Sequence, residues 1–305
     1  MAVVRLPVVT GPTGAGKSAL ALAFAATRPV TIVSADSRQV YRGFDIGTAK
    51  PTAAERLAVP HEALDVADPA ERFGAARWAE AATDAIERAR AAGRVPLLVG
   101  GTGLYLRALF EPLFEEPPLD PAARAALEGE LAAWDTARLR EAVVRVDPAR
   151  AHLGRTQLLR ALEIHRLTGT SISEWHARAG REARYAPRTL VVERGAALHA
   201  RLGARIDAML AAGWVREVEG LMAIVPDAAP AWNATGYDAL RQVVRGTLDL
   251  AQARSRVLIA TRQYAKRQRT WFRHQLDAAT VTTVTLGEPG ATELAWSWWN
   301  ALEAP

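Results

Sequence analysis

The chain has 305 residues, half of them hydrophobic, and a net charge of +5 with a pI of about 9.9, which predicts a globular protein of one or two domains with a polyanionic partner. It has no cysteine, which excludes disulfides, thiolate catalysis and cysteine-ligated zinc. Because no apolar run has the length of a membrane span and the N-terminus lacks the features of a signal peptide, we expect a cytoplasmic protein with no membrane partner.

A predicted strand over 3–10 leads into a glycine-rich loop and then into an Ala/Leu-rich helix over 17–28. The loop reads Gly11-Pro12-Thr13-Gly14-Ala15-Gly16-Lys17-Ser18 and fits the phosphate-binding pattern GxxxxGK[ST]. Its glycines allow backbone N–H groups to turn toward an anion, and the helix N-terminus adds partial positive charge. Lys17 is expected to reach the outer phosphate, and the Ser18 hydroxyl is expected to reach Mg²⁺. The motif leaves open which phosphate compound binds and which bond breaks.

A second strand is predicted over 30–34, and Asp36 follows it directly. In an open α/β sheet, residues just beyond a strand's carboxyl end face the ligand crevice, which predicts that Asp36 lies beside the phosphate loop. An N-cap of the following turn is an equally good role for this aspartate. A helix over 73–92 and a buried strand over 95–99 come next, and a second glycine-rich turn, 100–105, suggests a crevice shared with the phosphate loop.

From about residue 111 the pattern changes to a proline-rich patch (Pro112, Pro117, Pro118 and Pro121) followed by short helices. The helices are predicted over 121–134, 136–146, 157–168 and 171–179, and no strand is evident before 188–192, with 185–187 as the return. We therefore expect an α/β fold, a P-loop NTPase-like parallel sheet flanked by helices, whose core domain comprises 1–111 and 187–305 and whose all-helical insertion domain comprises 112–186.

A helix over 198–212 places Arg201 and Arg205 one turn apart, which fits either a solvated face or a clamp on an anion. A helix opens at Gly236-Tyr237, and a long basic helix follows over 251–275. Its cations alternate with Tyr264, Trp271 and Phe272, a pattern that suits a nucleic-acid backbone with stacking but also an ordinary solvated helix. A last strand is predicted over 280–286, and the tryptophan-rich tail 294–302 is most simply a docked core helix.

All but three of the 38 cationic residues are arginine, and the lysines lie at 17, 50 and 266. A compositional bias explains the excess of arginine. An ammonium is a compact point charge that a guanidinium does not replace at a tight site, so each lysine is informative.

In these motifs the chain resembles the bacterial tRNA dimethylallyltransferases over nearly its whole length. The matching segments are the phosphate loop, Ser34-Ala35-Asp36-Ser37, Tyr41-Arg42-Gly43, Asp45-Ile46-Gly47-Thr48-Ala49-Lys50-Pro51, Pro60-His61, Leu64-Asp65, Gly100-Gly101-Thr102-Gly103-Leu104-Tyr105, Arg160-Ala161-Leu162-Glu163, Gly236-Tyr237 and Lys266-Arg267-Gln268-x-x-Trp271-Phe272-Arg273. The loop alone is shared with many enzymes, whereas its combination with Asp-Ile-Gly-Thr-Ala-Lys-Pro is highly specific.

The resemblance implies transfer of a dimethylallyl group from its diphosphate to N6 of the adenosine beside the tRNA anticodon, by a monomer that uses Mg²⁺ held by Ser18. It implies that Asp36 is the general base, that Thr102 is the active-site threonine, and that Arg205 and loop residues 11–18 bind the diphosphate. Contacts with the tRNA anticodon stem-loop are implied for Asp36, Ser37, Arg38, Gln39, Lys50, Gln157, Arg160, Gly236, Tyr237, Lys266, Arg267, Gln268, Trp271 and Arg273. Gln157 and Ala239 depart from residues common in the family, which puts details of RNA contact in doubt but not the chemistry.

Two other functions fit the loop by itself. A nucleotide or small-metabolite kinase is the commoner use of the motif, but no clear strand ending in a magnesium-binding aspartate follows the insertion, and the basic helix has no task in such an enzyme. A non-catalytic RNA-binding module that is switched by a nucleotide leaves Asp36 and Arg205 without a task. Whether ATP also binds the loop stays open.

Overall fold

The computed structural model describes residues 3–111, 119–178, 184–276 and 280–302. These residues form two compact units, one comprising 1–110 with 184–305 and the other 111–183. The prolines at 112, 117 and 118 of the predicted linker lie outside the described residues.

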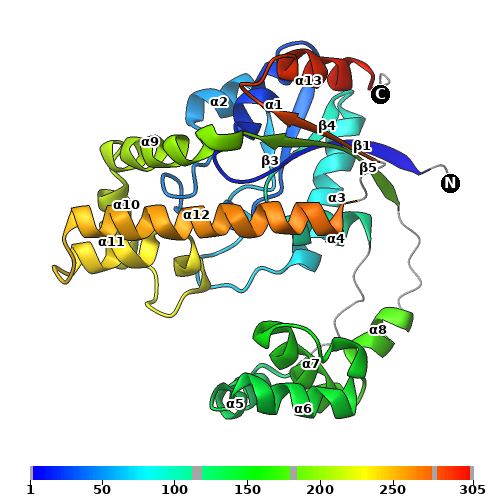
Figure 1. Ribbon diagram of the computed structural model, residues 1–305, viewed down its shortest axis with the longest axis vertical. Helices are drawn as coiled ribbons and strands as arrows, with labels where there is room; N and C mark the ends of the chain where they lie inside the picture. Colours follow the sequence, from blue (N-terminus) through cyan, green and yellow to red (C-terminus); the bar gives the residue numbers. More distant parts are fainter. Residues whose placement is uncertain (1–2, 112–118, 179–183, 277–279, 303–305) are drawn as a thin grey trace. The chain divides into compact units, whose positions relative to one another are not determined.

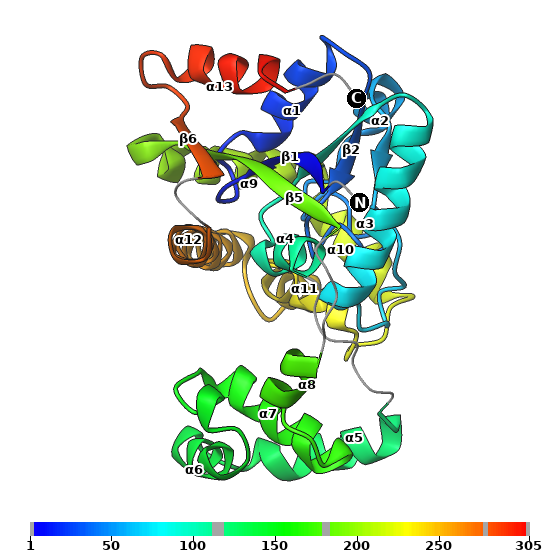
Figure 2. The same cartoon turned by 90° about the vertical axis from the view of Figure 1, so that its right-hand side faces the viewer.

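The larger unit is built on a six-stranded parallel sheet with the strand order β3-β2-β4-β1-β5-β6. Its strands are β1 (Val4–Thr10), β2 (Val30–Ser34), β3 (His61–Glu62), β4 (Val95–Val99), β5 (Tyr185–Glu193) and β6 (Val281–Thr285). The central strands are continuous apolar runs because helices cover both faces of a parallel sheet. Figure 2 shows α1 (Lys17–Ala25) and α13 (Ala291–Asn300) on one face, and α3 (Ala75–Ala91) and α4 (Gly103–Phe110) on the other.

The remaining helices of this unit are α2 (Ala53–Ala58), α9 (Leu198–Ala211), α10 (Trp214–Met222), α11 (Tyr237–Val244) and α12 (Leu250–Gln275). α9 to α12 lie together in Figure 1, where α12 is the long orange helix. Because all strands run in one direction, the loops that follow β1, β2 and β4 meet at one edge of the sheet. These are the loops in which the sequence analysis places the phosphate loop, Asp36 and the second glycine-rich turn.

The smaller unit is helical throughout its described residues, with α5 (Pro121–Ala132), α6 (Thr136–Val146), α7 (Arg155–Thr168) and α8 (Ile172–Arg178). It has an apolar core of its own, with Leu139, Val143, Leu158 and Ile164 completely buried. α7 ends at Gly169, whose left-handed conformation, with φ of 72°, terminates the helix as the sequence predicted.

The parallel α/β sheet flanked by helices is confirmed, with differences in detail. β5 begins at Tyr185 rather than 188, because 185–187 pair with 4–6 of β1 and the Tyr185 hydroxyl donates to Glu87. The sequence analysis assigned no helix to Ala53–Ala58, Gly103–Phe110 or Trp214–Met222, which form α2, α4 and α10, and no strand to His61–Glu62, which forms β3. α2 has only six residues and depends on a capping box between Thr52 and Glu55, and α10 follows α9 with only Ala212 and Gly213 between them.

The predicted C-terminal core helix is also confirmed, as α13 packs directly on the helix behind the phosphate loop. The Trp299 ring stacks on Phe24 of α1, with centroids 4.7 Å apart and planes 5° apart, and its indole N–H donates to Thr27. Trp299 is completely buried. The interaction anchors the C-terminal end of α1, whose N-terminal end carries Lys17.

We predict that Trp299→Ala lowers the free energy of unfolding by about 3–5 kcal/mol, the usual cost of deleting a buried tryptophan. Denaturant unfolding followed by circular dichroism measures this change. Leu294→Ala is the matched control, because Leu294 lies on the same helix and is 46% exposed, so its effect should stay within about 0.5 kcal/mol. Equal effects of the two substitutions would contradict the anchoring role.

Candidate active site

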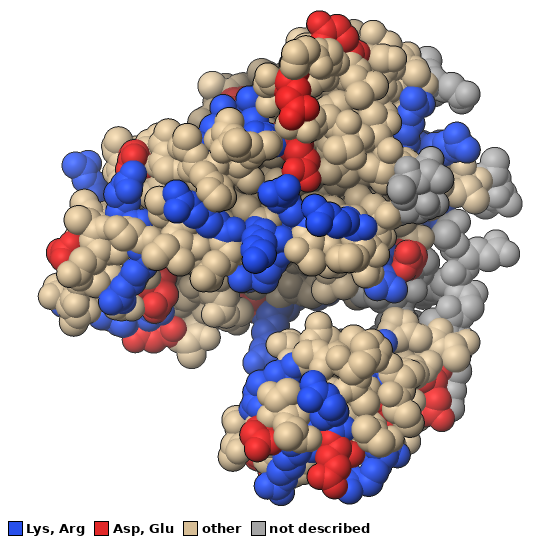
Figure 3. Space-filling view, in the orientation of Figure 1, with Lys and Arg blue, Asp and Glu red and all other residues tan. Residues whose placement is uncertain are grey.

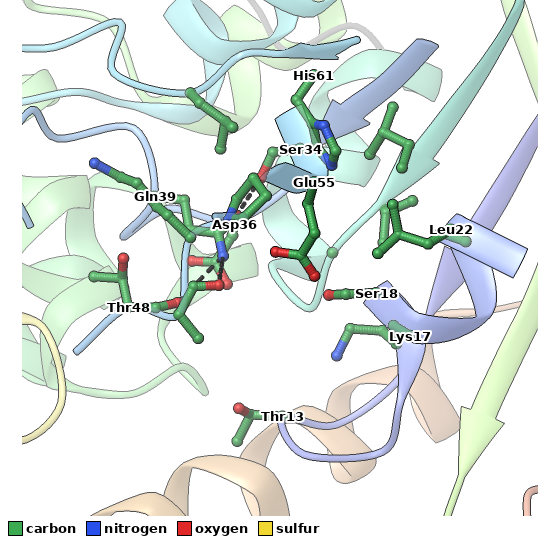
Figure 4. A pocket seen from close by; sticks show the side chains of 18 of the residues that line it. Thr13, Lys17, Ser18, Leu22, Ser34, Asp36, Gln39, Thr48, Glu55 and His61 are labelled. Atoms are coloured by element: carbon green, nitrogen blue, oxygen red, sulfur yellow. Dashed lines mark hydrogen bonds between the residues drawn. The ribbon is translucent and has the colours of Figure 1, made fainter. Parts of the chain in front are cut away.

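A cavity of about 360 Å³ lies at the carboxyl edge of the sheet, between the phosphate loop and the loops after β2 and β4. In Figure 4, Lys17 and Ser18 point from α1 into the space that Asp36, Thr48 and Glu55 border from other sides. Its lining residues include Thr13, Lys17, Ser18, Ser34, Asp36, Gln39, Thr48, Lys50, Glu55, His61, Arg205 and Gln268. The predicted phosphate-binding residues, the predicted base and the predicted diphosphate-binding arginine therefore share one cavity.

The phosphate loop takes the backbone conformation that its glycines predict. Gly11, Gly14 and Gly16 have φ of 135°, 80° and 107°, values that residues with a side chain rarely adopt. The Lys17 ammonium donates to the carbonyls of Gly11 and Pro12, both at 2.9 Å. Burial and the nearby Arg205 guanidinium lower the pKa of Lys17 to about 8, and the Asp36 carboxylate partly opposes them.

Side chains from elements distant in the sequence form hydrogen bonds with the backbone of three consecutive residues of this loop. The N–H of Thr13 donates to Gln268 of α12 at 2.8 Å, Arg201 donates to the Gly14 carbonyl at 3.2 Å, and Arg194 donates to the Ala15 carbonyl at 3.1 Å. In a trans peptide the C=O of one residue and the N–H of the next point in opposite directions. An arginine that holds the Ala15 carbonyl on the outside therefore directs the next N–H toward the inside of the loop.

The two arginines on α9 differ in their surroundings. Arg201 is exposed and holds the loop, whereas Arg205 lines the cavity, where burial lowers its pKa and Asp36 raises it. The sequence analysis did not identify Arg194 as a residue of the site, because its position directly after β5 was the only indication of such a role.

Asp36 fits both roles considered for it. Its Oδ1 accepts the N–H of Arg38 at 2.8 Å, which is a local cap of the turn, and its carboxylate also lines the cavity. The Thr102 hydroxyl oxygen accepts the N–H of Ser37 at 3.0 Å, and the N–H of Thr102 donates to Ala35 at 3.1 Å. The turns after β2 and β4 are thereby joined, and Thr102 lies beside the loop that carries Asp36.

A second, smaller cavity of about 70 Å³ shares Thr13, Asp36, Thr48 and Arg205 with the first. Its wall is mostly apolar and comprises Leu202, Ile206, Met209, Trp214, Val257 and Tyr264, among others. Burial, followed by the nearby Asp36 carboxylate, raises the pKa of Tyr264 to about 12, so this hydroxyl stays protonated at neutral pH. The sequence placed Tyr264 among aromatics on a basic helix and gave no signal that it reaches Asp36.

The Asp-Ile-Gly-Thr-Ala-Lys-Pro loop is held from two sides. One Glu217 carboxylate accepts the N–H groups of Asp45 at 3.0 Å, Ile46 at 2.6 Å and Gly47 at 3.3 Å. The Lys50 ammonium, on a side chain only 1% exposed, donates to the Tyr41 carbonyl and to the carboxylates of Asp45 and Asp65. The ammonium is thus buried, while the carboxylates of Asp45 and Asp65 keep 56% and 30% of their side-chain exposure.

Several predicted RNA-binding side chains are engaged inside the protein. Lys50 makes the three contacts just described, and the buried Tyr237 donates its hydroxyl to Glu217 at 2.6 Å. The Gln39 amide donates to the carbonyls of Thr48 and Ala49. Gly236, with φ of 99°, begins α11 and lies against the Trp214 ring. The expected RNA contacts of these four positions stay predictions.

α12 has two different faces. Its cations Arg262, Lys266, Arg267, Arg269 and Arg273 are exposed, and Figure 3 shows blue side chains along the length of this helix. Two of its aromatic side chains point inward, since Phe272 is buried and the Trp271 ring lies against Gly103, where a Cβ atom would come within 2.2 Å of it. The exposed face is thus cationic, and Phe272 supports the core instead of a base stack.

Gln157 and Arg160 lie on α7 in the smaller unit. Gln157 is exposed, and Arg160 donates to Glu163 at 2.6 Å. Glu163 is itself buried and also pairs with Arg124. Arg160 therefore contributes to the internal charge network of this unit as well as to its surface.

Within the described residues, no cluster of three or more His, Asp or Glu side chains could hold a metal ion by itself. No helix in those residues is sufficiently long and apolar to cross a membrane.

Comparison with known families matches the IPP transferase family over residues 39–275 and the isopentenyl transferase family over residues 4–65. The chain is 46% identical over 280 residues to a tRNA dimethylallyltransferase of Anaeromyxobacter sp. (strain K), a match that covers 90% of this chain and 92% of that protein. It is 45% identical over 285 residues to the enzyme of the same name from Stenotrophomonas maltophilia (strain R551-3), with 88% and 90% covered.

Two solved structures are also similar. The full-length tRNA isopentenylpyrophosphate transferase from Bacillus halodurans has a TM-score of 0.69 and 32% identity, over 97% of this chain and 94% of that one. A eukaryotic dimethylallyltransferase acting on tRNA has a TM-score of 0.77 and 26% identity, over 92% and 74%.

We predict that one lysine titrates near pH 8, because burial and Arg205 disfavour its charged form. The chain has only three lysines, so ¹³C-lysine labelling gives three Cε signals that NMR can follow from pH 6 to 11. Lys17→Met should remove the signal with the low midpoint. The unliganded protein is used, since a bound anion would raise the midpoint. A Lys17 signal that titrates near the usual value of about 10.4 would contradict the prediction.

Proposed function

The chain belongs to the IPP transferase family and is a tRNA dimethylallyltransferase, and we propose that the cavity beside the phosphate loop is where it transfers a dimethylallyl group to tRNA. The donor is dimethylallyl diphosphate, the acceptor is N6 of the adenosine next to the anticodon, and diphosphate is released. The observation that carries this proposal is that Lys17 and Ser18 of the phosphate loop line one cavity together with Asp36 and Arg205. The chain works as a monomer in the cytoplasm, where its tRNA substrate is.

The phosphate loop and Arg205 hold the diphosphate. Negative charge grows on this group as its bond to the allylic carbon breaks, so donors fixed in advance around it stabilise the transition state. Lys17 supplies a point charge, Arg205 supplies a second cation from α9, and the backbone N–H groups at the start of α1 complete the cradle. We assign residues 11–18 to this role.

Asp36 acts as the general base. The adenine N6 attacks the allylic carbon while the bond from that carbon to the diphosphate oxygen breaks, and the proton of N6 passes to the Asp36 carboxylate. The cations Lys17 and Arg205 lie close enough to interact with this carboxylate electrostatically. Thr102 and Tyr264 place two hydroxyl groups near the same point and orient the base.

The residues present fit a Mg²⁺ ion bound together with the diphosphate. Mg²⁺ usually keeps several waters and binds one or two protein oxygens plus substrate phosphates, so a cluster of protein carboxylates is not required. The Ser18 hydroxyl lies at the start of α1 and lines the cavity, which the carboxylates of Asp36 and Glu55 border from other sides. When bound, the ion would neutralise charge on the leaving group.

The exposed cations of α12 bind the tRNA backbone, and the turn at Ser37 and Arg38 receives the target nucleotide. The adenine has to leave its stack to reach Asp36, as in other enzymes that modify bases. The second cavity, which contains Arg38 and Tyr264 beside Asp36, supports this placement. Gln157 and Arg160 of the smaller unit are proposed as further RNA contacts.

A metabolite kinase is not supported by this arrangement. The strand after the insertion, β5, ends in Glu193, whose carboxylate pairs with Arg269 of α12 at 3.3 Å. β4, the other neighbour of β1, is followed by Gly100-Gly101-Thr102 rather than by an acidic residue.

The direct test uses unmodified tRNA, dimethylallyl diphosphate labelled in the allyl group, and Mg²⁺, without ATP. Label should enter the tRNA at the adenosine beside the anticodon, and diphosphate should be released in equal amount. An absolute requirement for ATP, with release of ADP, would instead indicate a kinase.

We predict that Asp36→Asn lowers kcat by about 10²–10⁴, the usual effect of losing a general base, because the amide accepts no proton from N6. Binding of tRNA and of the donor should change by no more than a few-fold, because the amide retains the cap to Arg38. Single-turnover kinetics and filter binding measure the two quantities. If the Asn variant turned over at the wild-type rate across the pH range, Asp36 would act only as a cap of the turn and not as the base.

We predict that tRNA affinity falls steeply with salt, because exposed cations on α12 neutralise phosphates and release their counterions. Lys266→Ala with Arg267→Ala should flatten the plot of log affinity against log salt by about 1–2 units. Arg216→Ala with Arg245→Ala is a control for net charge, since Arg216 belongs to α10 and Arg245 directly follows α11. If the slope of this plot were unchanged in the α12 variant, the helix would not be part of the interface with tRNA.

A further inference from the structure

The amide of Gln268 makes two hydrogen bonds of 2.8 Å within the protein. Its Oε1 accepts the N–H of Thr13, and its Nε2 donates to the carbonyl of Gly101. Gln268 is only 6% exposed, although it lies between the exposed cations Arg267 and Arg269 of α12. Both ends of the amide are therefore occupied on the inner face of the helix.

The two partners of Gln268 belong to different parts of the site. Thr13 is in the loop that holds the diphosphate, and Gly101 directly precedes Thr102, which bonds to the N–H of Ser37 beside Asp36. A chain of short contacts therefore runs from the phosphate loop through one side chain to the turn that carries the base.

The sequence around the turn accommodates this side chain. A Cβ atom on Gly101 would lie 2.2 Å from Nε2 of Gln268 and 3.2 Å from the carbonyl oxygen of Gly11, so only glycine allows the approach. The neighbouring Gly103 likewise admits the Trp271 ring. Two glycines of the Gly-Gly-Thr-Gly turn are thus explained by the docking of α12.

From this geometry, and resting on the proposed function, we propose that Gln268 is a positioning residue for the transfer reaction, which fixes the spacing between the diphosphate cradle and the turn holding Asp36. This role differs from the RNA contact that the family resemblance implies for it. Displacement at carbon needs the nucleophile and the leaving group in line, and an error of about 1 Å can cost about 10² in rate. A side chain that fixes the two halves of the site should therefore affect kcat more than binding.

The test compares Gln268→Met, which keeps length and shape but removes both hydrogen bonds, with Gln263→Met. Gln263 lies on the same helix and is exposed, so it controls for a changed surface on α12. Single-turnover transfer of labelled dimethylallyl, filter binding of tRNA and donor titration are measured on each folded variant. We expect Gln268→Met to lower the transfer rate by about 10² while tRNA affinity changes less than threefold, and Gln263→Met to change neither.

The Gln268→Glu variant adds a second measurement, the pH dependence of the transfer rate, which a merely structural role of Gln268 would not change. A protonated carboxyl group can accept from Thr13 and donate to Gly101 as the amide does, whereas the ionised form faces the Gly101 carbonyl with like charge. The rate of the Glu variant divided by that of the Met variant should therefore rise as pH falls from 8 to 5. The charged groups that share the cavity are Lys17, Asp36, Lys50, Glu55, His61 and Arg205, and Arg267 and Arg269 are adjacent on α12; all are common to both variants.

A Met variant with a wild-type rate, a loss of tRNA affinity as large as the loss of rate, or a Glu-to-Met ratio that is constant with pH would each overturn the inference. Wild-type protein is assayed in parallel. If it transfers no label, the proposed function fails, whereas an active wild type beside an equally active Met variant contradicts only the role of Gln268.

Discussion

The arrangement of positive charge around the phosphate loop is the constraint on which the rest of the site depends. A diphosphate site has to keep cations close together before the anion arrives, at an electrostatic cost. The protein meets this cost with carbonyl acceptors for Lys17 and with the carboxylate of Asp36, which interacts with both Lys17 and Arg205. The predicted base is therefore also the counter-charge of the cradle, which links the two halves of the reaction electrostatically.

The two buried lysines show how different partners give one residue type different roles. Lys50 is surrounded by two carboxylates and a carbonyl, so its charge is neutralised locally and it holds the Asp45–Pro51 segment in place. Lys17 has only carbonyl partners at hydrogen-bond distance, so its charge is left to act on an anion. Neither role suits a guanidinium, which is consistent with the retention of both lysines in an arginine-rich chain.

The two faces of α12 differ, and the proposed RNA contacts and the proposed reaction site lie on opposite faces of it. Its outer face presents exposed cations, and its inner face contacts the phosphate loop and the Gly-Gly-Thr-Gly turn through Gln268 and Trp271. The helix is in turn held to the sheet by the pair between Arg269 and Glu193. A residue pattern that indicates an RNA-binding helix therefore also contains the side chains that shape the catalytic edge.

The sequence by itself determined the parallel α/β fold, the phosphate loop and the placement of Asp36 after β2 at the carboxyl edge of the sheet, because strand periodicity and glycine spacing are local signals. The family followed from the resemblance of its motifs. Only the tertiary structure decided which of the remaining residues meet. Arg194, Glu217 and Tyr264 act through partners from about 170 to 230 residues away, and sequence spacing carries no information on such contacts. For the same reason, the sequence could not separate Lys50, Tyr237 and Gln268, whose side chains are used inside the protein, from Lys266 and Arg267, which are exposed.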